Sequence, residues 1–135
     1  MAKTNEAKLW LRIKNLKVKG HFTRIESSTL NGIPDVNACH NGEEVWLELK
    51  ANTHKDLGLS KWQKVWIAKR IKAGGTVFII NRPQKERALK IYRGSVVLGT
   101  QISAQEQHIS VKEPIDWELV QRELFPGGEA RVKAR

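Results

Sequence analysis

The order of hydrophobic patterns along this 135-residue chain predicts one α/β domain built on a mixed β-sheet. A helical pattern comes first and is followed by three strand patterns. A second helical pattern leads into a wholly apolar run, which is typical of a strand covered on both faces. The length suits one hydrophobic core, and neither an internal repeat nor a domain boundary is visible. We therefore expect a single domain over residues 1–127, followed by a basic, flexible tail over 128–135.

The first helical pattern covers residues 4–18, with Thr4 or Asn5 as its cap and Gly20 after its end. An amphipathic helix is expected here, because apolar side chains recur at helical spacing on one face. These side chains are Leu9, Trp10, Ile13 and Leu16.

Three strand patterns follow, separated by dipeptides that favour turns. The strands are expected at 21–26, 33–39 and 44–51, with Asn31-Gly32 and Asn41-Gly42 in the turns. The third pattern is the strongest, because Val45, Leu47 and Leu49 alternate with Trp46, Glu48 and Lys50. Glu48 and Lys50 are therefore expected on the same face of the sheet.

A second helix is expected at residues 60–73, between the capping box of Ser60 and Gln63 and the stop signal Gly74-Gly75. Its expected apolar face consists of Trp62, Val65, Trp66, Ala68 and Ile71. A buried strand at 76–80 follows. The last third has weaker patterns, which favour strands at 87–94 and 95–100 and a closing helix at 115–125.

The charge of the chain favours a polyanionic partner and argues against several other classes of protein. The formal net charge is +10 and the sequence pI is about 10.0, a large excess for one small domain. No apolar run approaches the roughly 20 residues that span a bilayer, and the N-terminus lacks a signal-peptide core. Cys39 is the only cysteine, so no internal disulfide or cysteine-based zinc site is expected. The four histidines show no metal-ligand spacing either.

Asp35, Glu48 and Lys50 form the constellation that best indicates a chemical function. A hairpin joins their two strands, so Asp35 is expected beside Glu48. Two adjacent carboxylates repel each other unless a cation lies between them, and Mg²⁺ prefers such oxygen ligands. The plain alternative is a surface hairpin with an ordinary cross-strand ion pair, since Glu-x-Lys is common in strands.

Three segments together resemble the PD-(D/E)XK nuclease superfamily. They are GIPDV at 32–36, WLELK at 46–50 and LSKWQKVWIAKRIKAGGTVFII at 59–80. Within the superfamily the chain is most similar to phage-borne and VRR-Nuc-type endonucleases, and more distantly to archaeal Holliday junction resolvases. The resemblance covers roughly residues 20–80, and the C-terminal third carries no such signal.

This resemblance implies a restriction-endonuclease-like core, with a central mixed sheet flanked by helices in the order α-β-β-β-α-β plus C-terminal additions. It implies that Asp35, Glu48 and the Leu49 carbonyl bind Mg²⁺, for which Mn²⁺ would substitute. Lys50 would be the catalytic lysine. Gln63 would reach the same site from the second helix, and this role is compatible with its place in the capping box.

The resemblance also implies a further acid at the metal site, and two residues compete for this role. Glu26 follows the first strand, where phage relatives have a glutamate. Glu6 lies on the first helix, where resolvase-like members place an acid, although a glutamate there also stabilises the helix N-terminus. We expect Glu26 as the catalytic and metal-binding residue.

DNA-binding residues are expected among the basic side chains around this site. Arg24 and Lys55 are nearest to it, and the second helix adds Lys61, Lys64, Lys69 and Arg70. Each of these could instead belong to an ordinary solvated helix face. Trp46 and Trp62 are weaker candidates for base stacking, because tryptophans more often belong to a core.

These observations predict a Mg²⁺-dependent DNA endonuclease of the phage type, with branched or nicked DNA among its candidate substrates. The alternatives are a sequence-specific restriction or homing endonuclease of the same fold and a non-catalytic basic DNA-binding module. An RNA-binding protein is disfavoured, because the aromatic-glycine pattern of common RNA-binding domains is missing. A homodimer is expected, because cutting two strands usually needs two sites. We place the protein in the cytoplasm of a bacterial or phage-infected cell.

Overall fold

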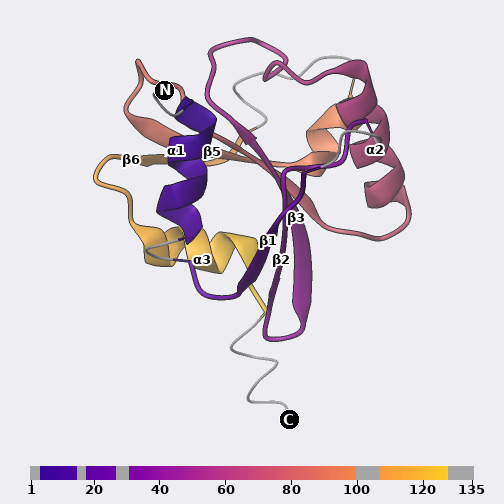
Figure 1. Ribbon diagram of the computed structural model, residues 1–135, viewed down its shortest axis with the longest axis horizontal. Coiled ribbons are helices and arrows are strands. Elements are labelled where there is room, and N and C mark those ends of the chain that lie inside the picture. The colour runs from indigo at the N-terminus through magenta and orange to yellow at the C-terminus, as the bar shows by residue number, and fades with distance from the viewer. Residues whose placement is uncertain (1–3, 15–17, 27–30, 100–106, 128–135) are drawn as a thin grey trace.

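A six-stranded β-sheet with helices on both faces forms the body of the protein (Figure 1). The computed structural model describes residues 4–14, 18–26, 31–99 and 107–127. The strands are β1 (His21–Arg24), β2 (Val36–His40), β3 (Glu43–Lys50), β4 (Val77–Asn81), β5 (Ala88–Arg93) and β6 (Gln107–Lys112). The helices are α1 (Asn5–Arg12), α2 (Lys61–Lys72) and α3 (Trp117–Leu124), with a 3-10 helix η2 (Gly94–Leu98).

The strands lie in the sheet in the same order as in the chain. Strands β1, β2 and β3 form one antiparallel unit, and β4, β5 and β6 form another. The central pair β3 and β4 is parallel, and α2 provides the crossover between them. The mixed sheet that the sequence predicts is therefore confirmed.

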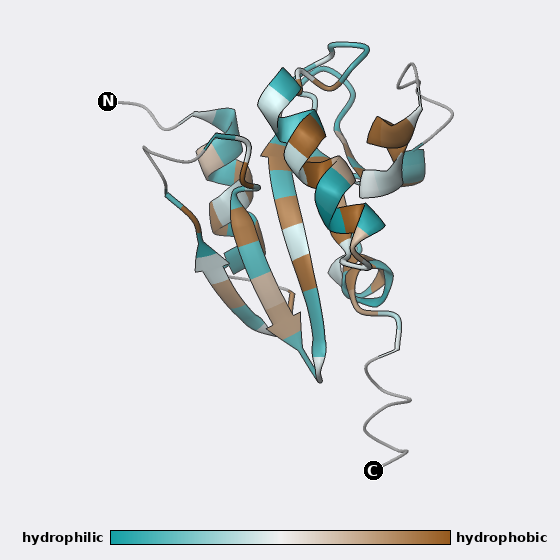
Figure 2. Cartoon of the chain, turned by 90° about the vertical axis from the view of Figure 1, so that its right-hand side faces the viewer, coloured by the Kyte–Doolittle hydropathy of each residue, from teal (hydrophilic) through white to brown (hydrophobic). Residues whose placement is uncertain are grey.

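Two hydrophobic clusters cover the two faces of the sheet. Helices α1 and α3 pack on one face, where Leu9, Ile13, Val120 and Leu124 meet the inward side chains of the strands. Helix α2 and η2 pack on the other face, around Ile67 and other buried residues. Along the strands hydrophobic and hydrophilic residues alternate, which Figure 2 shows in brown and teal. In β3 the burial departs from this alternation at Glu48, which is hydrophilic but buried between Leu47 and Leu49.

Both predicted helix caps are confirmed. Thr4 accepts a hydrogen bond from the Ala7 amide at 3.1 Å and begins α1. Ser60 and Gln63 form the full capping box of α2. Helix α1 ends at Arg12 rather than near residue 18, and residues 15–17 lie outside the described part of the chain.

The expected apolar face of α2 is confirmed for Trp66 and Ile71 and is wrong for Trp62 and Val65. Its fully buried residue is Ile67, while the Trp62 and Val65 side chains are 54% and 37% exposed. Trp66 and Ile71 are partly buried beside Ile67, so the helix turns that side towards the sheet. The segment before α2 adds Leu57 and Leu59 to the same buried cluster.

The C-terminal third also differs from the expectation. Residues 94–98 form η2 rather than a strand, and Gly94 lets this segment approach Val77 so closely that a Cβ atom there would lie 2.9 Å from its side chain. Strand β6 was missed, because it is an edge strand whose one fully buried residue is Val111. The closing helix is confirmed as α3. The expected tail at 128–135 lies outside the described residues.

No helix in the described residues is long and apolar enough to cross a membrane. Cys39 is a free thiol on the exposed side of β2.

Candidate active site

Strand pairing brings Asp35 to Glu48. Val36 pairs with Leu47 in the antiparallel β2–β3 ladder, so the same register places Asp35 opposite Glu48. The Leu49 amide donates a hydrogen bond to Asp35 Oδ2 at 2.8 Å, which holds this carboxylate against the end of β3. Asp35 and Glu48 therefore share the sheet face that α2 covers.

Glu48 is a buried acid in the middle of the sheet, with only 2% of its surface exposed. Its Oε2 atom accepts a hydrogen bond from Gln63 Nε2 at 3.1 Å and lies 3.6 Å from Lys50 Nζ. Burial and then the charge of Asp35 raise the pKa of Glu48 to about 8, against the opposing effect of the Lys50 ammonium. A hydrogen bond between the two carboxyl groups adds to this rise. With both groups ionised, Glu48 Oε1 is buried without a hydrogen-bond donor.

Lys50 is held at the same place by three oxygen atoms. Its Nζ atom donates to Gln63 Oε1 at 3.2 Å and to the Gly58 carbonyl at 3.3 Å, and it faces Glu48 Oε2. Only 11% of the Lys50 side chain is exposed. The ammonium is therefore positioned by surrounding atoms rather than free in solvent.

Gln63 has both of the roles that the sequence left open. Its side-chain Oε1 atom accepts a hydrogen bond from the Ser60 backbone amide at 2.8 Å, and its backbone amide donates to Ser60 Oγ at 3.1 Å. The same side chain bridges Glu48 and Lys50. The start of α2 is thus tied directly to the two charged residues of β3.

The further acid that the sequence predicts, Glu26, is less closely associated with Asp35, Glu48 and Lys50 than expected. The Ile25 amide donates to the Asp35 carbonyl at 2.7 Å, which brings the segment after β1 alongside, but the Glu26 side chain is exposed. Glu6 is also exposed, and its charge is the smallest of the causes that raise the pKa of Glu48. Among the described residues, no group of three or more acidic, histidine or cysteine side chains is arranged to hold a metal ion.

Asn81 is a site-supporting residue that the sequence analysis missed. It is 3% exposed and exchanges hydrogen bonds with the Asn52 backbone, at 3.1 Å to the amide and 2.9 Å to the carbonyl. It pairs with Lys50 across the parallel strands and so fixes the chain as it leaves β3. The signal was a lone amide side chain at the end of an otherwise apolar strand.

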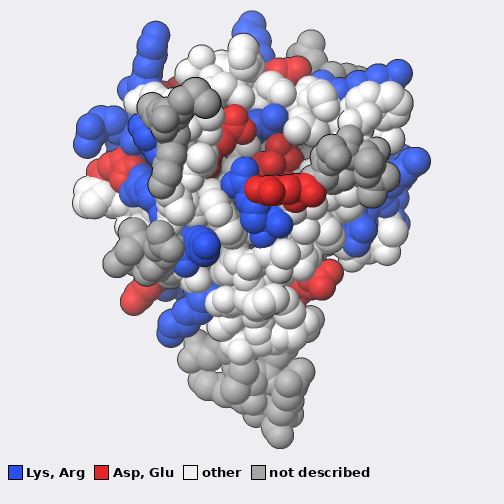
Figure 3. Space-filling model, in the orientation of Figure 1, with Lys and Arg blue, Asp and Glu red and all other residues white. Residues whose placement is uncertain are grey.

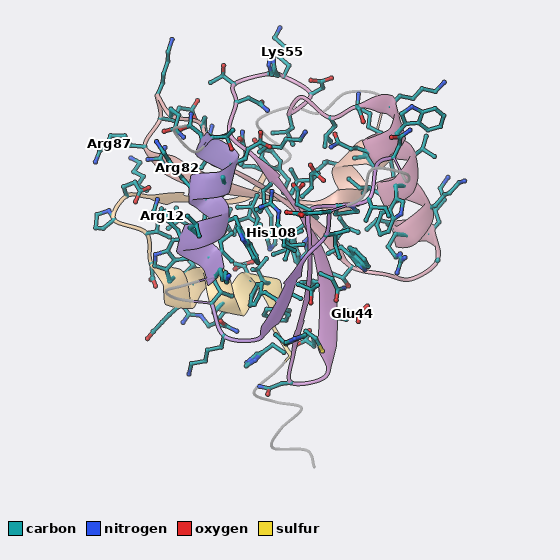
Figure 4. The ribbon with its side chains drawn as sticks, viewed as in Figure 1. Arg12, Glu44, Lys55, Arg82, Arg87 and His108 are labelled. Carbon is teal, nitrogen blue, oxygen red and sulfur yellow. The ribbon has the colours of Figure 1, made fainter. Side chains whose placement is uncertain are left out.

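The basic residues expected to bind DNA have different surroundings. Lys55 points outward from the loop between β3 and α2 (Figure 4), and Lys61 and Lys69 are also exposed. Lys64 pairs with Asp56 at 3.5 Å. The other two lie against aromatic rings, with Arg24 5.7 Å from the Trp10 ring and Arg70 4.6 Å from the Trp66 ring. Basic side chains are spread widely over the face in Figure 3.

Two arginines, Arg12 and Arg82, lie close together beside α1. Arg12 and Arg82 both contact Glu113, at 2.7 and 2.8 Å, and appear next to each other in Figure 4. With Lys8 they help to line a cavity of about 160 Å³. The Arg82 amide donates to the Lys50 carbonyl at 2.9 Å, so this cavity adjoins the end of β3.

The donor atoms of the site fit a hard divalent cation. Asp35 and Glu48 bring carboxylate oxygens together, and the carbonyl of Leu49, the residue between Glu48 and Lys50, is the further ligand that the sequence analysis expected. Two facing carboxylates, one of them buried with a raised pKa, are an arrangement that a cation would relieve.

Comparisons with known proteins find a likeness in structure but none in sequence. No model of a known protein family and no curated protein sequence matches the chain. The structure is similar to that of Hjc, a Holliday junction resolvase from the archaeal hyperthermophile Archaeoglobus fulgidus. The TM-score is 0.55 at 13% sequence identity, and the match covers 88% of this chain and 96% of Hjc. The chain therefore has the restriction-endonuclease-like α/β fold.

Proposed function

We propose that this protein is a metal-dependent endonuclease that hydrolyses phosphodiester bonds in DNA. The observation that carries the proposal is the buried Glu48 carboxylate, which faces Asp35 and is bridged to Lys50 by Gln63. The fold supports this proposal by analogy, because a Holliday junction resolvase has the same fold.

Asp35, Glu48 and the Leu49 carbonyl would hold Mg²⁺, or Mn²⁺ in its place. Such a cation, when bound, activates water and offsets the charge that builds up on a phosphate. Lys50 would place its ammonium on a phosphate oxygen, where its charge stabilises the transition state. Gln63 would keep Glu48 and Lys50 at their present separation, since it contacts both.

Glu26 is our proposed residue for completing the cation site, because it follows β1 in the segment that bonds to the Asp35 backbone. Glu6 is the alternative, since its charge adds to the raised pKa of Glu48 as the smallest of the causes. If Glu6→Gln reduced cleavage more than Glu26→Gln, the role would pass to the first helix.

The substrate and setting are proposed from charge and resemblance. A net charge of +10 favours DNA as the partner, with Lys55, Lys61 and Lys69 as exposed phosphate contacts. We propose that the enzyme selects branched or nicked DNA and acts as a homodimer in the cytoplasm of a bacterial or phage-infected cell. Its proposed relatives are the phage-borne, VRR-Nuc-type members of the PD-(D/E)XK superfamily.

A cleavage panel tests this function. Linear, nicked, flapped and four-way DNA would be incubated with Mg²⁺, Mn²⁺ or EDTA, and the products separated on denaturing gels. We expect cleavage that needs the metal and falls at least ~10²-fold in Asp35→Asn, the scale of losing a key electrostatic group. DNA binding without any metal-dependent cleavage would instead identify a non-catalytic DNA-binding module.

A further inference from the structure

Trp62 is exposed to solvent, so packing in the hydrophobic core does not explain a tryptophan at this position. All five tryptophans lie in the described residues, and Trp62 is the only one classed as exposed, at 54%. The rings of Trp46 and Trp66, by contrast, pack edge to face with their centres 5.1 Å apart, and the Arg70 guanidinium lies over both rings. An indole left in water gives up the free energy that burial of a large aromatic side chain supplies. This position therefore suits a side chain that acquires its contact on binding.

The backbone of Trp62 is tied to both sides of the candidate active site. It directly precedes Gln63, whose side chain contacts Glu48 and Lys50. Gly32, at the start of the segment that leads to Asp35, lies directly against it, because a Cβ atom on Gly32 would be only 2.2 Å from the Trp62 carbonyl oxygen. The Trp62 backbone thus lies between the segment that leads to Asp35 and the residue that contacts Glu48 and Lys50.

The charges around Trp62 suit an anionic ligand. The Lys61 ammonium lies 5.7 Å from the centre of the Trp62 ring. Helix α2 has five basic residues and no acidic residue; Lys61 adjoins Trp62, Lys64 is paired with Asp56, and Lys69, Arg70 and Lys72 follow in the last turn. An exposed aromatic ring beside a cationic side chain is an arrangement with which proteins hold the bases and phosphates of single-stranded nucleic acid.

We propose that Trp62 stacks on an unpaired base of the DNA strand whose phosphate lies at Asp35, Glu48 and Lys50. This inference rests on the proposed nuclease function and specifies its substrate as DNA with an unpaired segment next to the cleaved bond. A fully paired duplex keeps its bases stacked on one another and presents no free face to the indole. Trp62 is then a specificity residue, which favours flapped, gapped or branched DNA over plain duplex.

The competing explanation is an apolar contact with a second copy of this chain. Val65 and Leu98 are the other large hydrophobic side chains exposed in the described residues, at 37% and 48%. Such an interface would depend on all three side chains. A base-stacking site depends on the Trp62 ring alone and accepts phenylalanine in its place.

Binding to three DNA ligands tests the inference directly. Fluorescence anisotropy would be measured with Ca²⁺ in place of Mg²⁺, on a single-stranded oligonucleotide, a 5′-flap and a blunt duplex of the same sequence. Trp62→Ala should weaken binding to the single strand and the flap at least about fivefold, the low end for loss of one stacked base. Binding to the duplex should stay within about twofold, and Trp62→Phe should retain most of the affinity for the flap.

A double variant, Val65→Ser with Leu98→Ser, is the matched control for the apolar surface. It should bind all three DNA ligands like the unmodified protein. Equal losses on duplex and flap in Trp62→Ala, or no loss on either, would overturn the stacking role even if metal-dependent cleavage is observed. Loss of self-association in both Trp62→Ala and the control, measured by sedimentation, would assign the surface to a dimer instead. An unmodified protein that neither binds nor cuts DNA would remove the proposed function itself.

Discussion

Burying a carboxylate costs free energy unless a cation or enough hydrogen-bond donors compensate for it. Glu48 is 2% exposed, faces Asp35, and has one oxygen bonded to Gln63. Its pKa is raised to about 8, so the metal-free site holds a proton at neutral pH. The residue is therefore destabilising for the fold whenever it is ionised without a cation. Buried acids with strongly raised pKa values are concentrated at ligand-binding and catalytic sites.

Glu48→Gln should stabilise the metal-free protein in a pH-dependent manner. The pKa of Glu48 rises from about 4.5 in the unfolded chain to about 8 in the fold, so ionisation favours the unfolded chain. The unmodified protein should lose stability relative to the variant as the pH rises through this window, on the order of 5 kcal/mol in total. Urea unfolding in EDTA at pH 5, 7 and 8.5 measures this difference. A difference that stays constant with pH would mean that Glu48 is ionised in the fold throughout.

Lys50→Ala should separate chemistry from binding. Its ammonium is held by Gln63 and Gly58 and has little exposure, so it contributes little to capture of the DNA backbone. We expect single-turnover cleavage at saturating DNA to fall at least ~10²-fold, with the dissociation constant changed little. Lys69→Ala is the control, and should weaken binding and reduce the salt dependence by roughly 0.9 in log–log slope. The reverse pattern would make Lys50 an ordinary phosphate contact.

At the scale of elements, the first turn of α2 connects every part of the site. Its capping box orders Gln63, and Gln63 in turn contacts Glu48 and Lys50 on β3. The turn that contains Gly32 packs against the same backbone and leads to Asp35. A shift of α2 would therefore move the catalytic candidates together. Local helix capping thus becomes a determinant of active-site geometry.

Gly32→Ala should damage both stability and cleavage. Gly32 has a φ of +87°, and a Cβ atom there would lie 2.2 Å from the backbone oxygen of Trp62. Gly74→Ala is the matched control, because Gly74 has a φ of +95° but no atom within 4 Å of its Cβ position. The control should cost about 1–2 kcal/mol from backbone conformation alone, and Gly32→Ala a further 1–3 kcal/mol from overpacking.

Thermal unfolding and cleavage assays at a temperature where both glycine variants are folded would measure these effects. Gly32→Ala should cut DNA more slowly even when folded, because the start of α2 is displaced. Equal stability and equal activity of the two variants would show that this turn does not position the site.

At the scale of the whole molecule, one carboxylate joins parts that are far apart in the chain. Glu113 follows β6 and binds Arg12 at the end of α1 and Arg82 just after β4. Hydrogen bonds from these arginines hold its pKa at about 2, well below the usual range. The N-terminal helix is thereby attached to the C-terminal part of the sheet.

Glu113→Gln should destabilise the protein by about 2 kcal/mol at pH 7, the scale of hydrogen bonds to a charged group. Because the folded-state pKa is lowered to about 2 from 4.5, this stability is fully present above pH 4.5 and is lost as the pH falls towards 2. Urea unfolding of both proteins at pH 7, 4 and 3 measures it. A penalty that persists unchanged at pH 3 would have to come from packing rather than from the charge of Glu113.

The β2–β3 pairing and the start of α2 were predictable, because the residues there have strong structural preferences. Alternation in β3 and the turn dipeptides predicted the register that brings Asp35 to Glu48, and the capping box predicted the start of α2. The exposure of Trp62 was not predictable, because this apolar side chain fits the same helical pattern as Trp66 and Ile71, which are partly buried. Edge strand β6 was missed because it buries too little for its pattern to be read. Roles assigned to Glu26, and to Arg24 and the other basic residues, stay predictions.

The sequential order of the strands makes the molecule divisible. Strands β1 to β3 and strands β4 to β6 form contiguous halves, and the exposed residues 53–56 lie in the loop between them. A break in that loop would leave Asp35, Glu48 and Lys50 on one fragment and Gln63 and Trp62 on the other. The parallel pairing of β3 with β4, the hydrogen bonds of Gln63 to Glu48 and Lys50, the Asn52–Asn81 bonds and the Arg12–Glu113 ion pair would then help to rejoin them. The fold thus offers a place to split the proposed nuclease, so that recovered cleavage would report that two fused proteins have met.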